Sequence, residues 1–190
     1  MKRHQQLLSE AIEREGAAQR ALFRGDREAA ASEFTQASEL YRQSWEEAPP
    51  GSYGRLVGML KAGVLAGGGE REAAYVLSAL PGHDQGSPTA AYARALAALI
   101  AGDDEAARRA SEEMRGGSDA FDRTADAIAA LAAGDRERYG AALTQIVRDF
   151  ERRAEHLTGV AVADTALMLQ QLAARRGLAV ELPSPVLPAS

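Results

Sequence analysis

Hydrophobic and polar positions along this chain follow the period of an α-helix, and Gly and Pro divide the pattern into segments. Most segments are 11 to 24 residues long, are rich in Ala, Leu, Glu and Arg, and lack the period-2 alternation of strands. The pattern predicts an all-α protein of about nine helices without a sheet. The expected helices cover residues 3–24, 27–48, 52–66, 70–80, 88–101, 104–115, 119–133, 136–157 and 160–176.

Polar residues and glycines at the ends of these segments support the same boundaries. Side chains that cap helix N-termini stand at Ser52, Ser87, Asp103, Ser118 and Asp135. Glycines that end helices stand at Gly25, Gly102, Gly134 and Gly177. Three prolines follow in the last 13 residues. We therefore expect one helical domain over residues 1–177 and an extended Pro-rich tail over 178–190.

The junctions between helices repeat one another. Turn glycines at positions 25, 68, 102 and 134 are followed by acidic or small residues, and the first unit carries Ala18, Ala30, Phe34 and Ala37 at fixed spacing. In these features the chain resembles the tetratricopeptide repeat (TPR) family, whose units of about 34 residues are two antiparallel helices. The resemblance covers roughly residues 10–150 and implies a TPR-like, right-handed array of helical hairpins.

In that family the first helix of each hairpin lines a concave groove that binds a partner. Carried over residue by residue, the resemblance implies a mostly apolar groove. Its lining would include Phe23, Met59, Leu65, Tyr92, Leu96, Leu99, Phe121 and Ile128. The groove positions carry no series of Lys, Arg and Asn. The resemblance therefore does not imply the clamp with which such domains hold a peptide carboxylate.

An apolar groove of this size is rarely left exposed on a protein surface. Three elements could cover the groove: the apolar helix 160–176 folded back as a cap, a second copy of the chain, or an amphipathic helix of another protein. Separately, Tyr41 and Trp45 lie four residues apart, with Tyr53 just beyond the Pro-Pro turn. They predict either an aromatic contact between the first two units or a hot spot for a partner.

Composition excludes several classes of chemistry. The 190 residues are 46% hydrophobic and 26% charged, contain no Cys, and carry a formal net charge of -5. The missing Cys removes disulfides, thiolate metal sites and cysteine nucleophiles, and the negative charge disfavours nucleic-acid binding. No segment has the pattern of a signal peptide or the length of a membrane span, so we expect no membrane association and a cytoplasmic location.

Motifs of catalysis are not found in the sequence. No nucleophile elbow, P-loop or dinucleotide fingerprint is present, so we expect a non-enzymatic protein without cofactor or metal. The densest group of titratable residues is Asp149, Glu151, Glu155 and His156, with Asp164 on the next helix. Its spacing does not place the potential ligands on one helix face, and we interpret it as a charged, solvated helix end.

The last third of the chain carries a second pattern. It runs from the Gly134-Asp135 turn and Tyr139 through a small-residue helix that ends at Gly177, and closes on the tail 184–188. This order resembles the end of the immunity protein 49 family of bacterial polymorphic-toxin systems, although Val186 stands where that family has an aromatic residue. The resemblance implies an antidote that works by binding a toxin. We therefore expect a protein–protein interaction module, with a small-molecule or lipid-binding helical domain as the alternative.

Overall fold

The computed structural model describes residues 1–80 and 86–189, and within these ranges it contains nine α-helices and no strand. This confirms the predicted all-α class. The helices are α1 (Arg3–Phe23), α2 (Arg27–Glu47), α3 (Gly54–Leu65), α4 (Glu70–Ala79), α5 (Pro88–Ala101), α6 (Asp104–Glu113), α7 (Asp119–Ala133), α8 (Arg136–Arg152) and α9 (Asp164–Arg175).

Most of the expected caps form. The side chains of Ser87, Asp103, Ser118 and Asp135 each accept a hydrogen bond from a backbone N–H in the first turn of the helix that follows. Ser52 does not, because α3 begins at Gly54 and the Ser52 hydroxyl donates to the Pro49 carbonyl oxygen at 2.7 Å. The local sequence therefore sets most helix starts without help from distant contacts.

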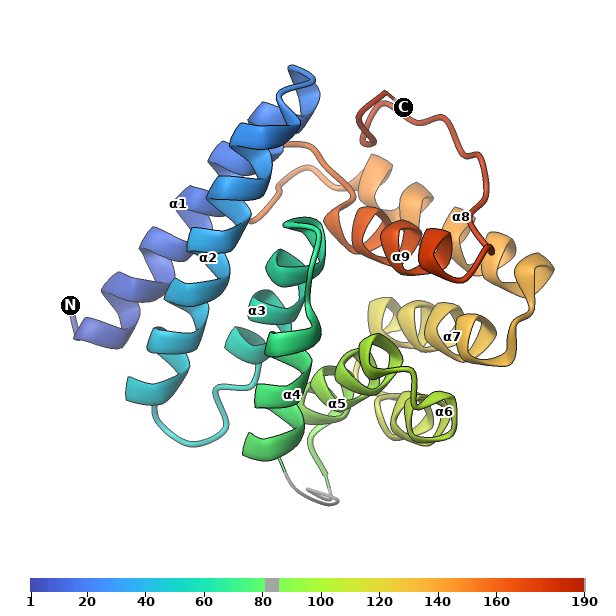
Figure 1. The fold of residues 1–190 in the computed structure, drawn as a ribbon, viewed down its shortest axis with the longest axis horizontal. Helices are drawn as coiled ribbons and strands as arrows, with labels where there is room; N and C mark the ends of the chain where they lie inside the picture. The colour runs from blue at the N-terminus through green and yellow to red at the C-terminus, as the bar shows by residue number, and fades with distance from the viewer. Residues whose placement is uncertain (81–85, 190) are drawn as a thin grey trace.

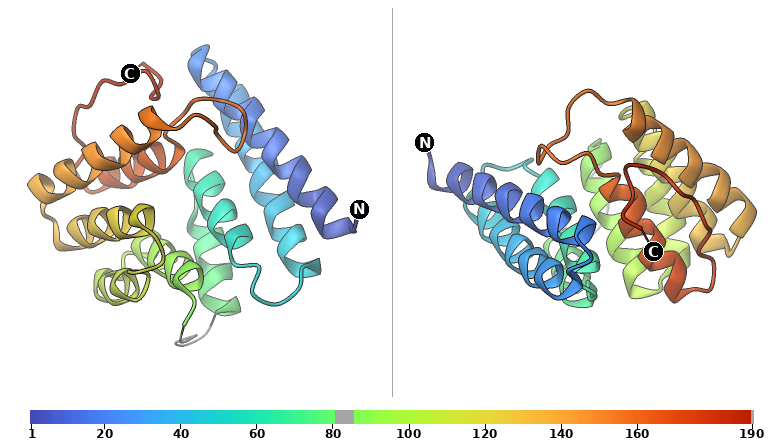
Figure 2. Two further views of the ribbon diagram at one scale, coloured as in Figure 1. Left: turned by 180° about the vertical axis from the view of Figure 1, so that it is seen from behind. Right: turned by 90° about the horizontal axis from the view of Figure 1, so that it is seen from above.

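Consecutive helices pack against one another along the chain, and α3, α5 and α7 also pack in series. Figure 1 shows the helices in chain order along an arc from α1 to α8, and α9 lies beside α8. The last helix also packs against α3 and α7, so it closes the inner side of the arc. Figure 2 shows the C-terminal segment beside α8 and α9 from two other directions.

The largest departure from the predicted boundaries lies between the last two helices. Helix α8 ends at Arg152 and α9 begins at Asp164, so residues 153–163, here called the strap, form no helix. Phe150 is the last large apolar side chain that α8 buries, and the next positions on its face are Arg153 and Ala154. Without further apolar surface to bury, the helix gains nothing from continuing.

The strap and the tail are both held to the helices. The Thr158 hydroxyl donates a hydrogen bond to Gln19 Oε1 of α1, and the Ala163 N–H donates to the Val186 carbonyl oxygen at 2.8 Å. Val186 is buried against the core, and Arg136 donates to the Ala179 carbonyl oxygen. The tail thus lacks helix but packs on the domain.

The core is built from small side chains that allow helix axes to approach closely. Gly58 of α3 lies against the ring of Tyr41, where an added Cβ would come within 2.8 Å of the ring carbons. Ala30, Phe34 and Ala37 are all at most 1% exposed, as expected for the small–aromatic–small series of the first hairpin. No helix in the described ranges is both long and apolar enough to cross a bilayer.

Candidate functional site

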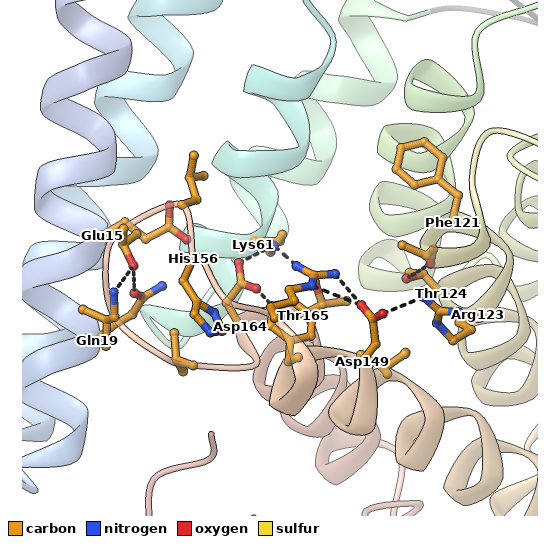
Figure 3. A pocket seen from close by; sticks show the side chains of 18 of the residues that line it. Glu15, Gln19, Lys61, Phe121, Arg123, Thr124, Asp149, His156, Asp164 and Thr165 are labelled. Atoms are coloured by element: carbon orange, nitrogen blue, oxygen red, sulfur yellow. Dashed lines mark hydrogen bonds and ion pairs between the residues drawn. The ribbon is translucent and has the colours of Figure 1, made fainter. Parts of the chain in front are cut away.

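A polar cavity of about 230 Å³ lies where α1, α3, α5, α7, α8, the strap and α9 meet. Figure 3 shows its side chains, which come from segments spread across the whole chain. Its charged and titratable residues are Glu15, Lys61, Tyr92, Arg123, Asp149, Arg153, His156 and Asp164. Such groups lose hydration when they are enclosed, so the way each is paired decides what the cavity can hold.

An ion pair between Lys61 of α3 and Asp164 of α9 crosses the cavity wall (Figure 3). Each side chain is only 15% exposed, and Lys61 Nζ also donates to Thr165 Oγ1 at 3.3 Å. Burial acts to lower the pKa of Lys61, but Asp164, Tyr92 and Glu15 together outweigh burial, so the pKa lies above its usual range. Lys61 therefore stays charged, and its charge is matched within the protein.

The deepest titratable group is Glu15 of α1, which is 4% exposed. The Tyr41 hydroxyl donates a hydrogen bond to Glu15 Oε2 at 2.7 Å. Burial raises the pKa of Glu15, and the negative charge of Asp164 raises it further, while Lys61 and Tyr41 act in the opposite direction. The net effect raises the pKa of Glu15 above its ordinary value, with burial as the main cause.

The mouth of the cavity carries a cluster of two guanidiniums around one carboxylate. Arg123 NH2 lies 3.0 Å from Asp149 Oδ1, and Arg153 Nε and NH2 lie 3.1 and 2.7 Å from Asp149 Oδ2. The Arg153 guanidinium stacks 3.8 Å above the ring of Phe150, which stacks in turn with His156. These contacts fix the direction of Arg153 at the start of the strap.

The unusual protonation of Glu15 predicts how stability depends on pH. Its folded pKa lies above the ordinary value of 4.5, so the unfolded chain loses this proton first and wild-type stability falls as pH rises from 4.5 through the folded pKa. Glu15→Gln keeps the shape without the titration. In urea unfolding, the variant should gain stability relative to wild type as the pH rises above about 4.5. Glu10→Gln, at an exposed position of α1, is the control. A difference that does not vary with pH would contradict a raised pKa.

Most of the predicted groove residues lie in the core. Met59, Leu65, Tyr92, Leu96, Leu99 and Ile128 are 0–6% exposed. Phe121 is partly buried, packs edge-to-face on Tyr92 and lines the cavity, whereas Phe23 is 43% exposed. Among the three covers considered, the structure shows the folded-back C-terminal helix. The buried part of the groove is therefore closed within the chain, and of its residues Tyr92 also lines the cavity.

The three residues of the predicted aromatic cluster, Tyr41, Trp45 and Tyr53, also differ in how deeply they are buried. Tyr41 is buried between Glu15 and Gly58, while Trp45 and Tyr53 are partly buried and pack on each other with ring centroids 5.7 Å apart. This is the contact between the first two units that the spacing allowed. A hot spot would have to use the remaining exposed edges of Trp45 and Tyr53.

The interpretation of the 149–156 segment as a solvated helix end needs correction. Glu151 and Glu155 are exposed, but Asp149 and His156 line the cavity together with Asp164, because the strap turns the chain inward after α8. Across the described ranges, no three His, Cys, Asp or Glu side chains are grouped as a metal site would require. The expected cluster thus contributes to a charged pocket instead.

Sequence reasoning did not single out Lys61 and Glu15 as site residues. Lys61 interrupts the apolar run 56–65, and Glu15 precedes the small-residue stretch Gly16-Ala17-Ala18. A single charge on an apolar or close-packed helix face is the signal that could have found both.

Comparisons with profiles of known protein families, with curated proteins and with solved structures find no match to this chain.

Proposed function

We propose that this protein is a non-enzymatic binding module of TPR-like architecture, and that its ligand is a small molecule held in the polar cavity. The observation that carries the proposal is the convergence of titratable side chains from α1, α3, α7, α8 and α9 on one partly open cavity. Ligand pockets combine apolar walls with a few polar groups that fix orientation, and this cavity has both.

The free-energy cost of this arrangement supports a role beyond folding. Replacing buried ion pairs with packed apolar residues is often neutral or stabilising, so stability alone gives little reason to enclose Lys61 and Asp164. The rest of the interior is filled by Ala, Leu, Ile and Val at close contact. A charged, incompletely filled space inside such a core is where a ligand would complete the packing.

Equilibrium dialysis against a small-molecule extract of the source organism tests the proposal, with mass spectrometry as the readout. Ala120 lines the cavity, so Ala120→Phe should fill it and lower ligand enrichment about tenfold or more. Ala141→Phe places the same ring on an exposed position of α8 and should leave enrichment unchanged. No enrichment by the wild type, or equal enrichment by a folded Ala120→Phe variant, would overturn the proposal.

A protein partner is the second candidate, as in the immunity-type proteins that the C-terminal segment resembles. It is favoured by Leu157, which is 73% exposed on the strap at the cavity mouth. A protein partner that covered the cavity mouth would bury this side chain in the interface. The two candidates separate experimentally: Leu157→Ser should weaken binding of a protein partner, whereas Ala120→Phe should weaken binding of a small molecule.

A further inference from the structure

The charges at the cavity mouth do not balance. Arg123 and Arg153 share the single carboxylate of Asp149, which accepts two hydrogen bonds from Arg153 at Oδ2 and forms an ion pair with Arg123 at Oδ1. A guanidinium carries several N–H donors in a planar fork, so one carboxylate leaves part of this donor capacity unused. The three side chains are 26–38% exposed, which places them where an entering ligand would meet them first.

The charges deeper in the cavity are already matched. Lys61 pairs with Asp164, and Glu15 accepts the hydrogen bond of Tyr41. At the mouth two guanidiniums share one carboxylate, so this cluster carries one positive charge in excess. A single excess positive charge suits a monoanion better than a cation, which the arginines would repel, or a doubly charged phosphate.

The remaining walls are apolar and the space is small. Phe121, Ile146, Val160 and Val162 line the cavity beside the charged groups. Its volume of about 230 Å³ lies below the range of roughly 300–1,000 Å³ that is common for drug-sized ligands. A compact ligand with an apolar body and one charged end would match both halves of this lining.

We infer that the cavity binds a small monocarboxylate, with the carboxylate between Arg123 and Arg153 and the apolar body against Phe121 and Ile146. This inference rests on the proposed function and specifies its ligand class. Arg123 and Arg153 are not among the groove residues predicted from the sequence. The proposed site therefore differs from the peptide-carboxylate clamp on the concave face of tetratricopeptide domains. Asp149 occupies part of the donor set and acts as an internal competitor for the ligand.

Calorimetric titration of the full chain with three probes of similar shape tests this assignment: benzoate, benzamide and benzylamine. Benzoate should bind with saturation and at least about tenfold more tightly than neutral benzamide or cationic benzylamine. Arg123→Gln should weaken benzoate binding about tenfold, and Asp149→Asn should tighten it by removing the competitor. Arg148→Gln, on the exposed face of α8, is the control for a general loss of positive charge.

If Arg123 and Asp149 served only the fold, their substitutions would not be expected to change benzoate affinity in opposite directions. Absence of benzoate binding, equal binding of benzamide, preference for benzylamine, or tighter binding of inorganic phosphate would each overturn the carboxylate assignment. The dialysis comparison of Ala120→Phe with wild type keeps the two proposals separate. If that comparison succeeds while benzoate fails, the cavity binds a ligand of another class; if both fail, the ligand site itself is rejected.

Discussion

Replacing Lys61 with Met should lower the free energy of unfolding by about 2–4 kcal/mol, a large part of the stability of a typical domain. The substitution leaves the Asp164 carboxylate only 15% exposed and without its partner charge. Urea unfolding monitored by circular dichroism measures the effect directly.

A second substitution shows whether the loss comes from the unpaired charge. Asp164→Asn keeps a side-chain oxygen for the Thr165 N–H but removes the negative charge, so Lys61→Met with Asp164→Asn should recover at least half of the lost stability. Additive losses would show that the pair contributes only through packing.

Ala30→Asp should be at least as damaging, with an expected loss of about 3–5 kcal/mol. Ala30 is 1% exposed in the contact between α1 and α2, and a carboxylate there would be enclosed without room or a partner. Thermal and urea unfolding measure the loss, and an unfolded variant at room temperature is the extreme form of the expected result.

Ser32→Asp is the matched control for Ala30→Asp. Ser32 is exposed on the same helix two residues later, so an added carboxylate stays solvated and should change stability by no more than about 0.5 kcal/mol. Similar stabilities of the two variants would contradict the packing of the first hairpin, because they would place residue 30 on the helix surface.

The helices could be predicted from the sequence because local chemistry sets most of their ends. Gly102 and Gly134 adopt left-handed conformations, with φ of 80° and 69°, that stop α5 and α7 at the predicted residues. The Ser and Asp caps discussed above begin the helices that follow. These signals act within a few residues, so they do not depend on which helices later pack together.

The cavity could not be predicted in the same way, since it depends on packing between distant segments. Lys61 and Asp164 are separated by more than half of the chain, and only the return of α9 onto α3 brings them together. The early end of α8 has a similar origin: the strap is stabilised by Gln19 and Val186, which are remote in sequence. Helical periodicity shows which face of α9 is apolar but not where that face packs.

The predicted groove residues could not be placed from the sequence either. The spacing of the repeats picked out side chains of α3, α5 and α7 that do lie close together, but they lie in the core and not on an open groove. An apolar groove and an apolar core have the same sequence pattern until the covering element is known. The predicted groove did not include Arg123 and Asp149, whose side chains are 28% and 26% exposed at the cavity.

The most direct test of a ligand site in the cavity is a methyl-resolved NMR titration of the protein with benzoate. The chain contains four isoleucines, and of these Ile146 lines the cavity, whereas Ile12, Ile100 and Ile128 do not. The account predicts a saturable shift of the Ile146 methyl resonance, with much smaller changes at the other three. An unchanged Ile146 signal, or equal shifts at all four methyl groups, would contradict binding in the cavity.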